Sequence, residues 1–385
     1  FSPALKTASL YFEDEIKGSL AFRPWSLILG ARYEMYTPQS INFGGLFGSD
    51  PFVESNNGSY LNPRLRFRFD FSDDTRLRLS WGKSSKMPPM TRIYQGPMYI
   101  DIIEENLTPP DSLPLVSTYI FEYDNTYMEG YQSSKAEASL DQKVGPLALI
   151  LTGFYSESTD IPRSIKDPIT IYRYSWTDYP NEDSRTPIDT LYTDNDSRHT
   201  FFNPVGYSRR WGAEFQFITK RIERISTVFR VDGSFYKSWS GADGTYMSTA
   251  RYNESLGRTI YPIYNYNESW RQKMIVNYRA DWLIKRIGMW VTFHVQQTLF
   301  DKWQSVVDPI AYSSGYYDPL TEETTYITPE ESATLGLDRV YDENDLRTRS
   351  TPNDRLLFNI NISKSLGRGA EVSMFVHNFF DDQAY

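Results

Sequence analysis

Apolar and polar side chains alternate across residues 61–83, LNPRLRFRFDFSDDTRLRLSWGK. Successive side chains of a β-strand point to opposite faces, so a period of two gives a strand one apolar face. Between the two alternating runs lies Ser72-Asp73-Asp74, a composition that favours a tight turn. The segment therefore predicts a β-hairpin whose apolar residues share one face: Leu65, Phe67, Phe69, Phe71, Leu77, Leu79 and Trp81.

The length of the turn fixes the cross-strand pairs of this hairpin. A three-residue turn keeps both apolar sets on the same face, whereas a two-residue turn would put them on opposite faces. The resulting register places Asp70 opposite Arg76, which is a favourable pair. It also places Arg68 opposite Arg78, where like charges repel each other. The polar face of the hairpin is therefore predicted to carry an excess of positive charge.

Four arginines of this polar face have no acid facing them, and we call them the cationic wall: Arg64, Arg66, Arg68 and Arg78. In the predicted register only Asp70 is available to neutralise Arg76, so the partners of the wall are expected to come from elsewhere. Glu34 and Glu137, on the strands before and after the hairpin, are expected to reach some residues of the wall. Because four guanidinium groups on one face would remain poorly neutralised, we expect a further acidic surface to pack against them.

The same alternation recurs along most of the chain and predicts about twelve strands. A further local strand is expected at 117–122, and the run at 147–156 is apolar on both faces, which leaves its type open. The expected strands cover residues 7–16, 25–35, 61–71, 75–83, 135–141, 147–156, 207–219, 225–235, 273–282, 289–296, 356–362 and 372–376.

The connections between these strands alternate between short and long. Transmembrane β-barrels of the outer membrane have short periplasmic turns and longer extracellular loops, and their apolar face points to lipid. A soluble antiparallel sandwich explains the alternation but not the difference in loop length. The pattern therefore favours an all-β transmembrane barrel, with these residues facing lipid: Leu65, Phe67, Leu77, Leu79, Trp211, Phe215, Val276, Val291, Phe358 and Ile360.

Composition agrees with a single architecture along the whole chain. The 385 residues show no change in composition that would mark a domain boundary. The mean hydropathy is −0.52, and no apolar run approaches the roughly 18 residues that a membrane-spanning helix requires. Aromatic residues reach 16%, cysteine is absent, and the net charge of −9 argues against nucleic acid as a partner.

Several motifs resemble the TonB-dependent outer-membrane transporters. The ending FVHNFFDDQAY looks like the signature of the family's penultimate strand, an Asn-aromatic-aromatic-Asp sequence followed by Tyr. The pair LYFEDEI and WSLILGARYE, the pair NPRLRFRFD and LRLSWGKSSKMPP, and the Gly-Xaa-Glu strand RRWGAEFQF are similar to successive segments of that family. No single motif is specific, but their order and spacing match over most of the chain.

This resemblance implies a barrel of about 22 strands around a plug, of which this chain would supply roughly the tenth to the twenty-first. Residues 1–385 would then be one partial barrel domain without the plug or the closing strand. The first predicted strand runs toward a short turn and the last runs away from one, so we expect at least one further strand at each end. The implied partners are outer-membrane lipid, the TonB protein, the protein's own plug domain, a surface lipoprotein as a further candidate, and an imported ligand.

Candidate ligand-binding residues lie in the predicted loops at 86–132, 157–206 and 301–351, and in the loop near residue 260. Aromatic side chains beside polar ones can bind a ligand by stacking and hydrogen bonding, but they can equally pack long loops together. Glycan importers, siderophore receptors and peptide importers all fit this composition. The candidates are Tyr172, Tyr174, Trp176, Tyr179, Tyr261, Tyr264 and Tyr266.

Catalytic and metal chemistry is not predicted. His199, His294 and His377 are isolated from any nucleophile and acid at a recognisable spacing. The acidic pairs and triplets of the loops lack an ordered calcium-binding motif, and no cofactor is expected: Asp194 and Asp196, and Asp342, Glu343 and Asp345. We therefore predict a transporter that imports a ligand across the outer membrane, energised through TonB. The alternative is a passive porin or a protein-secretion pore.

Overall fold

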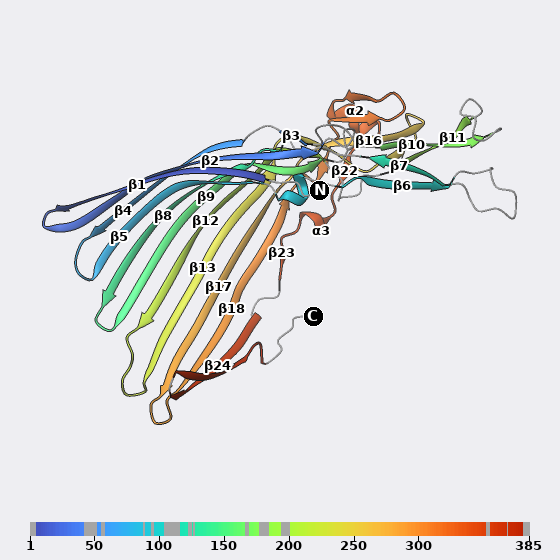
Figure 1. The fold of residues 1–385 in the computed structure, drawn as a ribbon. Coiled ribbons are helices and arrows are strands. Elements are labelled where there is room, and N and C mark those ends of the chain that lie inside the picture. Colours follow the sequence, from blue (N-terminus) through green and yellow to red (C-terminus); the bar gives the residue numbers. More distant parts are fainter. Residues whose placement is uncertain are drawn as a thin grey trace.

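The computed structural model describes residues 5–41, 52–54, 58–87, 89–93, 96–103, 116–121, 125, 128–165, 169–176, 185–193, 201–351, 355–367 and 369–379. Long antiparallel strands dominate the fold (Figure 1). Among the described residues, no helix combines the length and apolar character needed to cross a membrane.

Twelve strands follow one path through the main sheet, and each is antiparallel to its neighbours. The path visits the strands in the order of the sequence, so every connection is a hairpin or a loop between adjacent strands. Their bounds are β1 Leu5–Leu20, β2 Arg23–Ile41, β4 Gly58–Asp70, β5 Thr75–Lys86, β8 Tyr131–Val144, β9 Leu147–Ile165, β12 Phe201–Thr219, β13 Thr227–Ala242, β17 Glu268–Ile284, β18 Met289–Val306, β24 Arg355–Gly367 and β25 Ala370–Val376.

The predicted hairpin and its register are confirmed. In the β4–β5 pair, Asp70 lies opposite Arg76 and Arg68 lies opposite Arg78. The turn is closed by a hydrogen bond from the Ser72 amide to the Thr75 carbonyl, with an N···O distance of 3.2 Å. The ambiguous run at 147–156 forms part of β9, and the local strand expected at 117–122 forms β7, Val116–Phe121, which pairs with β6, Met98–Ile103.

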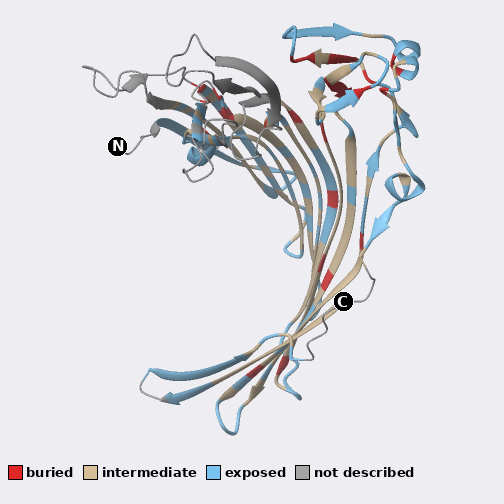
Figure 2. Cartoon of the chain, turned by 90° about the vertical axis from the view of Figure 1, so that its right-hand side faces the viewer, coloured by how far each residue is buried: buried red, intermediate tan, exposed pale blue. Residues whose placement is uncertain are grey.

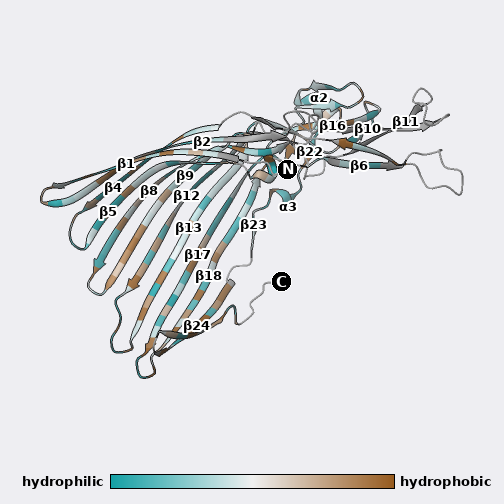
Figure 3. Ribbon diagram, in the orientation of Figure 1, coloured by the Kyte–Doolittle hydropathy of each residue, from teal (hydrophilic) through white to brown (hydrophobic). Residues whose placement is uncertain are grey.

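The alternation gives the sheet one apolar and one polar face, and Figure 3 shows the resulting bands of colour along the strands. Directly opposed residues share a face. One such row from β2 to β18 is mainly apolar: Trp25, Phe69, Leu77, Leu140, Leu151, Phe215, Gly233, Val276 and Gln297. The neighbouring row on the other face is mainly polar: Ser26, Arg68, Arg78, Ser139, Thr152, Glu214, Ser234, Ile275 and Thr298.

The apolar face is uncovered by other parts of the described chain. Large side chains on it are solvent-exposed, among them Phe12, Leu151 and Phe293, with exposed fractions of 66%, 44% and 43%. Val276 and Val291, which are predicted to face lipid, lie on the same face but are covered by neighbouring side chains, with exposed fractions of 4% and 6%. An exposed apolar surface of this extent needs an apolar environment, which the hydrocarbon of a membrane supplies.

Short turns gather at one end of the sheet and long connections at the other (Figure 1). The sheet curves like part of a barrel wall (Figure 2). Because the apolar face of a membrane barrel points outward to lipid, we assign the polar face to the concave side. The predicted loops contain more ordered structure than expected. They hold β3 Phe52–Glu54, α1 Met90–Ile93, β6, β7, β10 Ile169–Trp176, β11 Arg185–Thr193, β14 Thr245–Met247, β15 Arg251–Asn253, β16 Arg258–Asn265, β19 Ile310–Ala311, β20 Gly315–Asp318, β21 Glu323–Tyr326, α2 Pro329–Thr334, β22 Arg339–Val340, α3 Glu343–Leu346 and β23 Arg349–Ser350.

Two of these connections, β13–β17 and β18–β24, join into one small folded unit that we call the loop module, residues 244–265 and 310–346. Its sheet contains β14, β15, β16, β20 and β21. Its core contains Ile260, Tyr316 and Leu337, which are almost fully buried. Figure 2 shows buried segments in this unit, above the end of the sheet. The module therefore has a hydrophobic core of its own, outside the main sheet.

Candidate functional site: the polar face and its outer vestibule

The cationic wall is partly neutralised from within the sheet. Arg68 donates two hydrogen bonds to Asp70, at 3.0 Å and 2.7 Å, and Arg76 donates to the same carboxylate at 2.8 Å. Arg78 donates to Asp141 of the next strand at 2.6 Å. The carboxylate of Asp70 therefore bridges two guanidinium groups, so Arg68 finds a partner within its own hairpin, whereas the register predicts that the partners of the wall come from elsewhere.

Arg64 and Arg66 remain. They are exposed on the polar face, and neither has an ion-pair partner among the described residues. The acids expected to reach the wall are engaged elsewhere. Glu34 lies 2.8 Å from Arg32 and accepts a hydrogen bond from Asn62, and Glu137 lies 2.5 Å from Lys135. Two residues of the wall, Arg64 and Arg66, thus have no ion pair in the described part of the chain, and Arg68 and Arg76 share one carboxylate.

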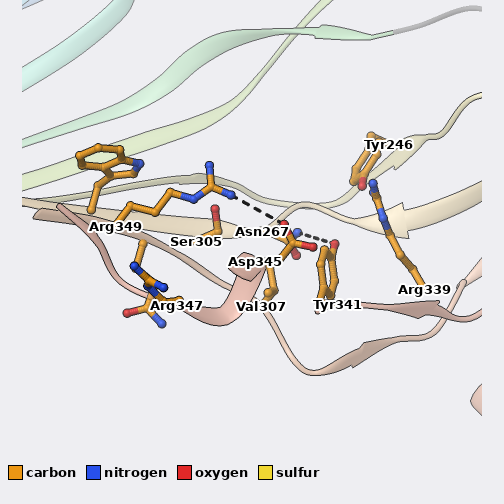
Figure 4. Close-up of a pocket in the computed structure, with 11 residues that line it drawn as sticks. Tyr246, Asn267, Ser305, Val307, Arg339, Tyr341, Asp345, Arg347 and Arg349 are labelled. Carbon is orange, nitrogen blue, oxygen red and sulfur yellow. Dashed lines mark hydrogen bonds and ion pairs between the residues drawn. The ribbon is translucent and has the colours of Figure 1, made fainter. Parts of the chain in front are cut away.

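A cavity of about 240 Å³ lies where the main sheet meets the loop module (Figure 4). Strand β18 contributes Trp303 and Gln304, and the loop module contributes Tyr246 and Tyr341. Three arginines line the same cavity, together with one acid: Arg339, Arg347 and Arg349, and Asp345. The lining is therefore aromatic and positively charged.

Few contacts hold the arginines of this cavity. The guanidinium of Arg339 lies 5.4 Å from the centre of the Tyr341 ring, and Arg349 lies 3.8 Å from Asp345. The side-chain amide of Asn267 donates a hydrogen bond to the Tyr341 hydroxyl at 3.1 Å (Figure 4). This bond connects the residue before β17 with the segment after β22. The guanidinium groups stay exposed to solvent, so they are available to an anionic ligand.

A second cavity, of about 450 Å³, adjoins the first and shares Trp303, Gln304 and Ser305 with it. Its other lining residues come from β13, β17 and the segment before β24: Ser238, Ser240, Ser269, Trp270, Arg271 and Thr351. We call the two cavities together the vestibule. Trp303 faces Arg271 across the strands and therefore lies on the polar face of the sheet. The vestibule thus runs from the loop module onto the concave face.

A buried carboxylate holds the strand ends beneath the vestibule. Asp301 accepts two hydrogen bonds from Arg271, at 2.8 Å and 2.6 Å, and lies 3.4 Å from Lys273. Its backbone carbonyl also accepts a hydrogen bond from the Thr351 amide at 3.0 Å. Asp301 therefore fixes β17 and the start of the segment that leads to β24 in one arrangement.

The tyrosines predicted to bind a ligand have different surroundings. Tyr261 and Tyr264 are buried in the loop module, with exposed fractions of 2% and 5%. The Tyr264 hydroxyl donates to the Leu337 carbonyl at 3.0 Å, and burial raises the pKa of this hydroxyl. The burial of these two residues favours the alternative role, packing of the loops. Tyr266 is partly buried, and its ring centre lies 5.3 Å from that of Tyr246 at the vestibule.

The remaining candidates lie elsewhere. Tyr172, Tyr174 and Trp176 belong to β10, whose side chains are not described, and Tyr179, Asp194, Asp196 and His199 lie outside the described residues. Asp342 caps α3 by accepting a hydrogen bond from the Asp345 amide at 2.9 Å. In the part of the chain that the structure describes, no cluster of three or more metal-ligating side chains occurs.

The vestibule residues were not predicted from the sequence. Trp303 and Arg349 are paired across β18 and β23, and Arg339 belongs to the second of two loops that fold together. A cluster of arginines between residues 339 and 349, DRVYDENDLRTR, was the available signal. In the same stretch acidic residues alternate with the arginines, and such a mixture of charges is typical of an ordinary solvated loop.

Comparison with known proteins agrees with the resemblance seen in the sequence. The family model described as "TonB dependent receptor-like, beta-barrel" matches residues 2–338. The chain therefore belongs to the TonB-dependent receptor family, which comprises receptors and transporters and not enzymes. No curated protein matches the sequence.

The solved structures that are similar to this chain include two siderophore receptors. The siderophore receptor PirA from Acinetobacter baumannii has 13% identity and a TM-score of 0.47, over 98% of this chain and 51% of that receptor. A mutant of the ferric enterobactin receptor PfeA from Pseudomonas aeruginosa, in complex with enterobactin, has 11% identity and a TM-score of 0.46, over 99% and 50%. The chain thus spans about half the length of these receptors.

Proposed function

We propose that this chain is barrel wall from an outer-membrane transporter that imports a ligand into the periplasm with energy supplied through TonB. The family match carries this proposal. The strand topology supports it, because antiparallel strands with one exposed apolar face and one polar concave face suit a membrane-spanning barrel. The vestibule, at the end with long connections, is the site where we propose that ligand first binds.

The cationic wall supports a plug inside the barrel. Arg64 and Arg66 lie exposed on the concave face with no acid paired to them in the described part of the chain. An acidic plug surface would form charge-assisted hydrogen bonds with them, each contributing about 1.5–3 kcal/mol where water is excluded. Two such contacts would hold a plug closed and could still be broken one after the other by a pulling partner.

A passive porin is the alternative that the same arginines favour. In an open channel, unpaired guanidinium groups on the inner wall would face water and select anions. The two functions therefore differ in whether the resting protein conducts ions. The ligand stays open between a glycan, a siderophore and a peptide.

The test is conductance of the full-length protein in planar lipid bilayers, for the wild type and the double variant Arg64→Gln/Arg66→Gln. Because the proposed plug closes the channel, we expect the wild type not to conduct. The double variant should leak ions and normally excluded solutes, since two plug contacts are lost. Arg224→Gln, in the short turn between β12 and β13, is the matched control and should stay closed.

A wild type that conducts from the start, with a change only in anion selectivity in the double variant, would instead support the porin. A separate experiment tests whether TonB supplies the energy for import. The full-length protein should form a crosslink to the carboxy-terminal domain of TonB, and absence of any crosslink in a closed, correctly folded protein would rule out that part of the proposal.

A further inference from the structure

We propose that the outward face of β13, β17 and β18 carries a binding site for the phosphates of lipid A, the phosphorylated glycolipid of the outer leaflet. The site consists of two lysines with tryptophan and glutamine between them, and we call it the outer-rim patch: Lys237, Trp239, Trp270, Gln272 and Lys302. This inference rests on the outer-membrane placement of the proposed function, but not on import or on TonB.

The strand register places both lysines on the apolar face. Trp211 lies opposite Lys237, Lys237 lies opposite Gln272, and Gln272 lies opposite Lys302. Opposed residues share a face, and Trp211 belongs to the face that is apolar from β2 to β18. Two cations on a lipid-facing surface are costly unless they lie at the membrane surface with an anion nearby.

The direction of the Lys237 side chain places its charge at the interface. Its ammonium lies 4.6 Å from the ring centre of Trp239 and 5.3 Å from that of Trp270. Trp239 is two residues closer to the long-connection end than Lys237, so the lysine extends toward that end. Lysines near the edge of the hydrocarbon extend in this way to reach the headgroups, and tryptophans mark the same depth.

In the part of the chain that the structure describes, the patch has no ion pair with an acid. Neither Lys237 nor Lys302 has a carboxylate within ion-pair distance among the described residues, and Lys302 is exposed. The neighbouring cation on this face behaves differently, because Arg209 donates to Glu157 at 2.9 Å. Two positive charges on the lipid side, without an ion pair among the described residues, would therefore be neutralised by an anion from the membrane.

The spacing suits a headgroup with two phosphates. Lys237 and Lys302 are separated by one intervening strand, which corresponds to about 10 Å between their backbones. Both side chains are long and can adjust their reach. The lipid A disaccharide carries a phosphate at each end, so one headgroup can meet both ammonium groups while Gln272 and the indole nitrogens bond to its sugar hydroxyls.

The experiment uses the full-length protein, freed of bound lipid and placed in phosphatidylcholine nanodiscs. Native mass spectrometry then measures binding of bisphosphorylated lipid A, of dephosphorylated lipid A and of phosphatidylglycerol. We expect bisphosphorylated lipid A to bind at least about tenfold more tightly than the dephosphorylated form, because each charge-assisted contact contributes on that scale. The double variant Lys237→Gln/Lys302→Gln should lose this preference.

The matched control is Lys143→Gln/Lys220→Gln, which removes two exposed lysines at the short-turn end and should leave the preference intact. Heat-modified mobility in gels checks that each variant is folded. Equal affinity for the two forms of lipid A, an unchanged preference in the Lys237/Lys302 variant, or equal binding of phosphatidylglycerol would each overturn the proposal. Since the conductance test does not depend on these lysines, a failure here leaves the proposed transporter intact.

Discussion

At the scale of single residues, Gly212 shows how the polar face accommodates large side chains. A Cβ atom at this position would lie 2.2 Å from the Phe235 carbonyl oxygen and 2.7 Å from the Phe154 ring. Because the nearest atom belongs to the backbone, rotation of a side chain cannot relieve this clash, and the backbone of β13 would have to move. We therefore expect Gly212→Ala to destabilise the barrel by about 1–3 kcal/mol, as overpacking does elsewhere.

The thermal midpoint of the full-length protein, followed by heat-modified mobility in gels, measures this effect. Gly153→Ala is the matched control, because it lies in the adjacent strand β9 and a Cβ atom there has no neighbour within 4 Å. Equal midpoints for the two variants would show that β13 yields easily and that the close approach has no energetic consequence.

Prediction from the sequence succeeded for single residues wherever one hairpin decides the outcome. The faces and pairs of Arg68, Asp70 and Arg76 follow from the parity of one turn. The partner of Arg78 is Asp141, which lies 63 residues away and becomes a neighbour only because β8 pairs with β5 across a long connection. Which wall residues stay unpaired therefore could not be derived from the hairpin alone.

At the scale of elements, the membrane explains which strands could be predicted. Inside the bilayer one face must be apolar, so a period of two appears in the sequence. Strands β9, β12 and β18 extend past the predicted ends, and Phe201 still pairs with Ile165. Beyond the lipid neither face has to be apolar, the alternation fades, and the sequence no longer shows where pairing stops.

The loop module is an element of a different kind. Strand β16 is buried on both faces, so its sequence RTIYPIYN shows no alternation and does not predict a strand. Aromatic residues in a loop suit both ligand contact and packing, so the sequence leaves the role of its tyrosines open. Only the pairing of β16 with β20, from a second loop, shows that they form a core.

Tyr264 tests whether this core joins the two loops. Tyr264→Phe removes the buried hydrogen bond to the Leu337 carbonyl and should cost the module about 1 kcal/mol. Hydrogen exchange should become several-fold faster in peptides that cover residues 258–265 and 329–340. Tyr252→Phe, at a position that is 64% exposed, should leave exchange unchanged. Equal hydrogen-exchange rates in both variants would mean that the Tyr264 hydroxyl does not contribute to the stability of the loop module.

High pH should act on the same contact. Burial raises the pKa of Tyr264 above its ordinary value, so its contribution is fully present below the ordinary tyrosine pKa of about 10. The contribution is then lost as the pH rises through the raised value. Exchange in the module should therefore accelerate in alkaline solution more strongly in the wild type than in Tyr264→Phe.

At the scale of the whole molecule, the two ends of the sheet differ in a way that defines orientation. One end has tight connections, such as Gly145-Pro146 between β8 and β9, and the other holds the loop module and the vestibule. If the protein is an importer, the vestibule has to face the outside, because the ligand reaches it before the channel.

Epitope insertion tests this orientation directly. An epitope placed after Thr321, in the exposed turn between β20 and β21, should bind antibody on intact cells. An epitope placed after Arg224, in the turn between β12 and β13, should bind only after the outer membrane is permeabilised. Both sites lie in exposed turns, so insertion should leave the strands paired, and heat-modified mobility verifies that each protein is folded. Labelling of intact cells at Arg224 and not at Thr321 would show that the barrel has the opposite orientation. That result would remove the basis for both the proposed entry site and the lipid A site.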